Sequence, residues 1–96
     1  MSALPQDFVG KAVYARDDVM IGHLKELVFG GEYALVRRSF FSRILVPVEA
    51  IEERDGRPTI MLTSSHLDNA PKVDAQRELS PAEKARLEQF YLKRAA

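Results

Sequence analysis

The side chains best suited to covalent chemistry gather in one short polar segment, residues 64–68, which contains two serines, His66 and Asp68. A serine nucleophile, a histidine base and an orienting carboxylate make up a catalytic triad. A triad is defined by its geometry in space, however, and its members usually come from separated segments. A polar exit from a strand, in which a serine caps a turn, explains the same residues more simply. We therefore predict no catalytic residue and expect that the protein is not an enzyme.

Metal and cofactor sites are not indicated either. The chain has two histidines and no cysteine, so a transition-metal site would have to recruit carboxylates. Asp17 and Asp18 are typical of a turn, because calcium requires carboxylates at alternating positions of a loop. Gly30 and Gly31 lie between two expected strands, whereas a phosphate-binding loop would place them ahead of a helix. We expect neither a metal ion nor a cofactor.

A basic and aromatic cluster occupies residues 37–43, where Arg37, Arg38 and Arg43 flank Phe40 and Phe41. Such a cluster can bind RNA through phosphate contacts and base stacking. It can also form the centre of a protein contact, where aromatic and arginine residues are enriched. In a third interpretation, both phenylalanines fold back into the core. We expect a protein contact through Phe40, Phe41 and Arg43, with RNA contact by Arg37, Arg38 and Arg43 as the alternative.

Short apolar segments separated by turn signals run along residues 8–63 and predict five or six strands. The glycine pair at 30–31 and the Asp-Gly pair at 55–56 are typical of hairpin turns. Pro47 can donate no ladder hydrogen bond, so the strand that contains it should stop or bend there. Residues 39–43 are expected to form an exposed loop. This pattern indicates a small antiparallel barrel or sandwich.

The composition changes after residue 63. We expect a barrel over residues 1–63, a polar linker over 64–79 and a helix over 80–96. Ser80, Pro81 and Glu83 predict the helix start, as a serine cap, a proline in the first position and a capping box. An isolated helix of this length is marginal, so its apolar side chains need a partner surface. That surface is either the barrel of the same chain or a second copy, and the contacts would come from Leu87, Phe90 and Tyr91.

Four segments in order, VGKAVY at 9–14, IGHLKEL at 21–27, YALV at 33–36 and LVPVEAI at 45–51, resemble the PRC-barrel family. That β-barrel domain is shared by the photosynthetic reaction centre H subunit and the C-terminal part of a ribosome-maturation factor. DNAPKV at 68–73, followed by a capped helix, is similar to the tail of stand-alone bacterial members. The chain departs from the family at residues 39–42, which are commonly glycine-rich there, and at Val48, which is often tryptophan.

The resemblance implies a fold and a broad role. The fold would be mainly β, a small antiparallel PRC-like barrel of five or six strands with a C-terminal α-helix. The role would be that of a structural or adaptor module in the assembly of protein or ribonucleoprotein complexes, without an activity or cofactor of its own. We therefore expect a non-enzymatic interaction module, with an RNA- or ribosome-associated accessory domain as the alternative.

The net charge and the length of the chain limit the classes of partner to be expected. The 96-residue chain has 14 basic and 14 acidic side chains, so no overall charge attracts it to nucleic acid or an acidic membrane. A domain this small buries a limited share of its surface, and self-association would add stability. We expect a homodimer with an unidentified protein partner. Without an export signal or a long apolar run, we expect a cytoplasmic location and no membrane insertion.

Overall fold

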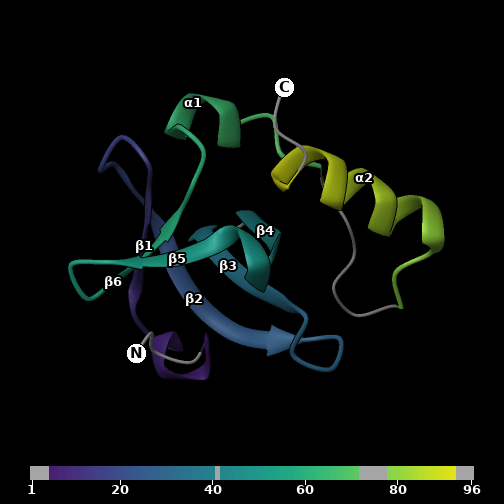
Figure 1. The fold of residues 1–96 in the computed structure, drawn as a ribbon, viewed down its shortest axis with the longest axis horizontal. Coiled ribbons are helices and arrows are strands. Elements are labelled where there is room, and N and C mark those ends of the chain that lie inside the picture. Colours follow the sequence, from purple (N-terminus) through teal and green to yellow (C-terminus); the bar gives the residue numbers. More distant parts are fainter. Residues whose placement is uncertain (1–4, 41, 72–77, 93–96) are drawn as a thin grey trace.

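The structure is a computed structural model that describes residues 5–40, 42–71 and 78–92 of the chain. The described residues form a mainly β fold with a C-terminal helix, as the sequence predicts (Figure 1). Along the chain the elements are η1 (Pro5–Phe8), β1 (Ala12–Ala15), β2 (Met20–Val28), β3 (Tyr33–Ser39), β4 (Ser42–Pro47), η2 (Val48–Ala50), β5 (Ile51–Arg54), β6 (Arg57–Ile60), α1 (Ser64–Leu67) and α2 (Pro81–Tyr91), where η marks a short 3-10 helix.

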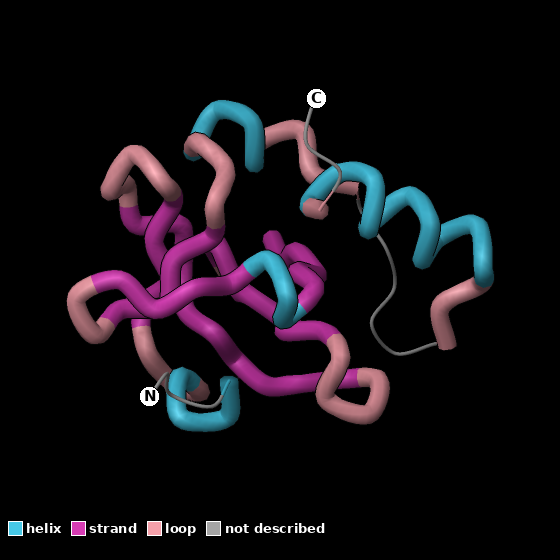
Figure 2. Tube along the Cα trace, viewed as in Figure 1, coloured by secondary structure: helices cyan, strands magenta, loops and turns pink. Residues whose placement is uncertain are grey.

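The six strands of the described residues form one mixed sheet in the order β4-β3-β2-β1-β6-β5. Figure 2 draws the strands in magenta. Consecutive strands pair antiparallel, as hairpins do, at β1–β2, β2–β3, β3–β4 and β5–β6. The pair β1–β6 is parallel, with Tyr14 opposite Thr59 and Ala15 opposite Ile60. The prediction of a purely antiparallel sheet is therefore wrong at this pair. Its direction follows from the orientation in which the β5–β6 hairpin lies beside β1.

The sheet is strongly curved. Its two edge strands, β4 and β5, follow each other in the chain and are joined by η2, which has 3 residues. So short a link between opposite edges requires the sheet to curl until these edges approach. Bulges interrupt the ladders β1–β2, β2–β3 and β3–β4, and bulges bend a strand and increase its twist. No ladder between β4 and β5 closes the sheet within the residues that the structure describes.

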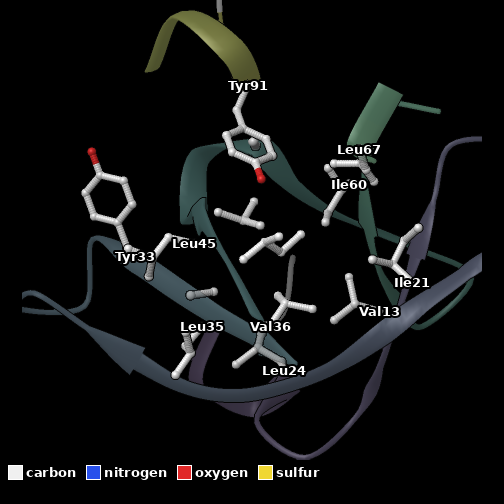
Figure 3. Close-up of a cluster of buried hydrophobic side chains, with 14 of the residues drawn as sticks. Val13, Ile21, Leu24, Tyr33, Leu35, Val36, Leu45, Ile60, Leu67 and Tyr91 are labelled. Atoms are coloured by element: carbon white, nitrogen blue, oxygen red, sulfur yellow. The ribbon is translucent and has the colours of Figure 1, made fainter. Parts of the chain in front are cut away.

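The core lies within this curl and under α2. Residues 33–36 of β3 and 44–47 of β4 are buried at every position, so both faces of these strands are covered, because successive side chains point to opposite faces. The helix α2 packs against β4. Figure 3 shows Tyr91 reaching from α2 into the cluster, with Leu67 of α1 beside Ile60.

The turns follow their local chemistry. Arg54 and Arg57 are cross-strand partners, and Asp55 and Gly56 between them have φ of 54° and 78°, which fits the predicted hairpin. Ser39 and Ser42 are also partners, so only residues 40–41 connect β3 to β4. This connection is tighter than the loop expected over residues 39–43, and Phe41 lies outside the described residues.

Two helices follow the sheet. The short helix α1 lies in the segment interpreted as a linker, where Thr63 caps it and Leu67 is buried. The capping box of α2 is confirmed. Ser80 Oγ accepts a hydrogen bond from the Glu83 backbone N–H at 3.1 Å, and Glu83 Oε1 accepts one from the Ser80 N–H at 3.0 Å. The expected extension of this helix beyond residue 92 lies outside the described residues.

Candidate interaction surface

Three large apolar side chains are exposed at one end of the sheet. Val19, Met20 and Phe40 are 46%, 53% and 76% exposed. Met20 opens β2, and Phe40 follows the last residue of β3. Because these residues come from two separate segments, only the fold brings them to one end, which we call the apolar end.

The strand register places the apolar end. Gly22 lies so close to β3 that a Cβ there would meet the carbonyl oxygen of Arg37 and the Cα of Arg38. Met20 precedes Gly22 by two positions in β2, and Phe40 follows Arg38 by two positions, just past the end of the antiparallel β3. Both residues therefore leave the sheet at the same end. Of the pair predicted to make a protein contact, Phe40 is here, and Phe41 lies outside the described residues.

Charged residues flank the apolar end on both sides. The turn before Met20 carries Asp17 and Asp18, and Asp18 adopts a left-handed φ of 67°. Asp18 lies 3.8 Å from the Arg57 guanidinium, and both side chains are well exposed. Arg43 lies just beyond the β3–β4 connection and is exposed. The end thus has an acidic flank and a basic flank.

The three arginines predicted for RNA contact are not equivalent. Arg37 and Arg43 are direct cross-strand partners and both are exposed. Arg38 is the extra residue of the bulge between them and Ser39, and its guanidinium lies 3.0 Å from an Asp68 carboxylate oxygen. It also donates a hydrogen bond of 3.4 Å to the Leu67 carbonyl. Arg38 therefore fastens α1 to the sheet, and two arginines remain accessible.

The predicted contact residues of the C-terminal helix belong to the core of their own chain. Leu87 and Tyr91 are buried, and Phe90 is half-buried with its ring 4.7 Å from that of His66 and 4.9 Å from that of Tyr91. Burial raises the pKa of Tyr91 above its usual range. Of the two surfaces considered for this helix, the structure thus uses the one in the same chain, and Leu87 and Tyr91 are not accessible to a partner.

The segment with serines and a histidine is organised for structure. The Ser64 hydroxyl donates a hydrogen bond of 2.9 Å to an Asp17 carboxylate oxygen, and the His66 ring contacts the Phe90 ring at an interplanar angle of 42°. The hydroxyl of Ser64 is thus directed at a carboxylate in another turn, away from the geometry of a nucleophile and base. Among the described residues, no group of three histidine, aspartate or glutamate side chains could hold a metal ion. None of their helices has the length and apolar character needed to cross a bilayer.

Sequence reasoning missed Val19 and Met20. A Val-Met pair after an Asp-Asp turn is a weak signal by itself, because single exposed apolar residues are common on protein surfaces. Its meaning depends on Phe40 at the same end of the neighbouring strand.

Neither a protein-family model nor a curated protein sequence matches this chain. The fold defines its class as a small, mainly β protein with a mixed sheet and one C-terminal helix.

Proposed function

We propose that this chain is a non-enzymatic PRC-barrel interaction module that self-associates through its apolar end and supports the assembly of a protein complex. One observation carries the proposal: Val19, Met20 and Phe40 are exposed together at one end of the sheet, although they come from two separate segments. Clustered exposed apolar residues mark interaction sites more often than scattered ones do.

The curvature of the sheet supports the barrel assignment. Edge strands joined by η2, bulges in three successive ladders and the close approach at Gly22 all bend the sheet in the way that barrel closure requires. The resemblance of residues 9–51 to the PRC-barrel family is consistent with this curl. On this proposal, β4 and β5 are the strands that meet at the seam.

Charge complementarity favours a second copy as the occupant of the apolar end. In a two-fold dimer the same surface of both copies forms the interface. Each contact from a residue of the first copy to a residue of the second is therefore repeated in the reverse direction. Asp18 of one copy, whose side chain is 70% exposed, can then face Arg43 of the other, while the apolar side chains pack in the middle. Three side chains offer a small apolar area, so we expect a weak dimer whose population depends on concentration.

Light scattering over a concentration series tests self-association. The average mass of the wild-type protein should rise toward that of a dimer, and Phe40→Ser or Met20→Ser should shift this rise to higher concentration. Val9→Ser is the matched control, because Val9 is 44% exposed and precedes β1, at the opposite end of that strand from the Met20 turn. A strict monomer at high micromolar concentration would overturn the proposal, as would an equal effect of Val9→Ser.

An RNA-associated accessory domain is the second candidate function. Arg37 and Arg43 are exposed cross-strand partners close in the chain to the exposed Phe40, which brings together phosphate-binding and base-stacking groups. Binding of a single-stranded RNA oligonucleotide should weaken steeply as salt rises. Absence of binding at low salt would remove this candidate.

A further inference from the structure

A row of basic side chains crosses three neighbouring strands in register. Arg37 of β3 is the direct partner of His23 in β2 and of Arg43 in β4. Directly opposite residues share a face of the sheet, with Cβ atoms of neighbours about 5 Å apart. All three side chains are exposed. His23 is distant in sequence from Arg37 and Arg43, and the ladder aligns all three.

A shallow depression accompanies this row. It has a volume of about 290 Å³ and is lined by Gly10, His23, Leu24, Lys25 and Arg37. Lys25 lies at the bulge of β2 and is exposed. The backbone N–H of Gly10 donates to the Leu24 carbonyl at 2.7 Å, which holds the chain before β1 against this part of β2. The depression thus adds a further cation to the row.

The three strands that carry the row contain few acidic residues. Like charges directly opposite each other in a ladder destabilise the sheet. The salt bridges within the described part of the chain engage Arg38, Arg57 and Lys84, and none engages Lys25, Arg37 or Arg43. Glu26 is the acidic residue nearest in the ladder, opposite Leu35. Within β2, β3 and β4, Glu26 is the one acidic residue, whereas these strands carry Lys25, Arg37 and Arg43 of the site and the imidazole of His23.

We propose that His23, Lys25, Arg37 and Arg43 form a binding site for a phosphoryl oxyanion. A carboxylate carries one charge and one arginine satisfies it, whereas a phosphoryl group carries more charge and offers several acceptor oxygens. Paired guanidiniums match such a group with charge-assisted hydrogen bonds, and a lysine adds a point charge. An anion bound here also offsets the repulsion between Arg37 and Arg43. The proposal does not rest on self-association: Arg43 also flanks the apolar end, whereas His23, Lys25 and Arg37 lie outside the surface defined there.

Thermal unfolding in pyrophosphate, with ionic strength matched by chloride, tests the site. Pyrophosphate should raise the melting temperature of the wild-type protein above that in chloride, and Arg37→Ser or Arg43→Ser should weaken pyrophosphate binding about tenfold or more. Arg86→Ser is the matched control, since Arg86 is exposed on α2 and should leave binding unchanged. Without pyrophosphate, Arg37→Ser should not lower the melting temperature, because it relieves a like-charge pair.

A second arm separates the two sources of the phosphoryl group. A single-stranded RNA oligonucleotide that binds, with a salt dependence whose slope falls by about one in Arg37→Ser, assigns the site to a nucleic-acid backbone. Pyrophosphate binding without RNA binding assigns the site to a free phosphate compound. That result rejects the RNA-associated function and leaves the proposed phosphoryl site in place. The proposed site is overturned if pyrophosphate stabilises no better than chloride and RNA does not bind. It is also overturned if Arg37→Ser and Arg43→Ser bind both probes as the wild type does.

Discussion

Ser64 makes two hydrogen bonds to Asp17, from its backbone N–H to Oδ1 at 3.2 Å and from its hydroxyl to Oδ2 at 2.9 Å. Asp17 lies in the turn between β1 and β2, and Ser64 begins α1, so the contact ties the first hairpin to the chain that leaves the sheet. The polar residues that invite a catalytic interpretation therefore connect distant parts of the fold.

Replacement of Asp17 by alanine should lower the melting temperature, because both hydrogen bonds are lost together. Ser64→Ala should have a smaller effect, since its backbone N–H still reaches Asp17. In the double variant the two losses should not add, because residues in direct contact are coupled. Chemical unfolding of the four proteins measures this coupling. Additive effects would show that the hydrogen bond between the Ser64 hydroxyl and Asp17 contributes nothing.

The hydrogen bonds between Ser64 and Asp17 should also make the stability of the protein depend on pH in the acid range. Hydrogen bonding from the Ser64 side chain lowers the pKa of Asp17 below its usual value. A carboxyl group with a depressed pKa in the folded state stabilises it fully above the unfolded-state pKa, about 3.9 for aspartate. This contribution is lost as the pH falls through the lower pKa of the folded state. Unfolding curves of wild type and Asp17→Ala should therefore converge below about pH 3.9, and a constant gap would contradict the prediction.

Gly22 should tolerate no side chain. A Cβ at this position would meet the backbone of Arg37 and Arg38, and backbone atoms cannot move aside as a flexible side chain can. We expect Gly22→Ala to destabilise the protein by about 1–3 kcal/mol, the usual cost of overpacking. Urea unfolding measures the loss, and Gly31→Ala provides a comparison in which the cost comes from a φ of 86° with open space around the Cβ. If the stability of Gly22→Ala equals that of the wild type, the strands can move apart at this position without cost.

Removal of the Tyr91 hydroxyl should maintain or raise the stability of the folded protein. The oxygen is buried and has no hydrogen-bond partner within the described residues, and such a group costs about 1–3 kcal/mol. Tyr91→Phe keeps the ring and removes the polar atom, so stability should rise by about 1 kcal/mol or stay level.

The control for this substitution is Leu87→Ala, in the same helix. Leu87 is fully buried, and truncation of a buried leucine costs about 2–5 kcal/mol. Loss of stability in this control together with no loss in Tyr91→Phe would locate the contribution of α2 in apolar packing. A clear loss in Tyr91→Phe would contradict the prediction and indicate that the hydroxyl is hydrogen-bonded in solution.

Local chemistry explains what the sequence could predict. Asp55-Gly56 supplies its own turn dihedrals, and Ser80 with Glu83 forms a cap within one helical turn. The mainly β class follows from several such turns between apolar segments. Pro47 ends β4, as its missing N–H requires.

Relationships between distant segments could not be predicted. The parallel pairing of β1 with β6 depends on where a hairpin docks, which no local pattern specifies. The pairing of Arg38 with Asp68 removes one arginine from a cluster that the sequence presents as three equivalent residues. Met20 and Phe40 share an end of the sheet only because of the β2–β3 register. The candidate surface is therefore a property of the fold, and composition alone does not reveal it.

Amide NMR spectra recorded over a dilution series test the proposed interaction surface most directly, because they report which residues sense a second copy. We predict concentration-dependent shifts at Val19, Met20 and Phe40 and at the flanking Asp18 and Arg43, with α2 unaffected. The same shifts should disappear in Phe40→Ser. Shifts confined to α2, or spectra that do not change with concentration, would contradict self-association through the apolar end.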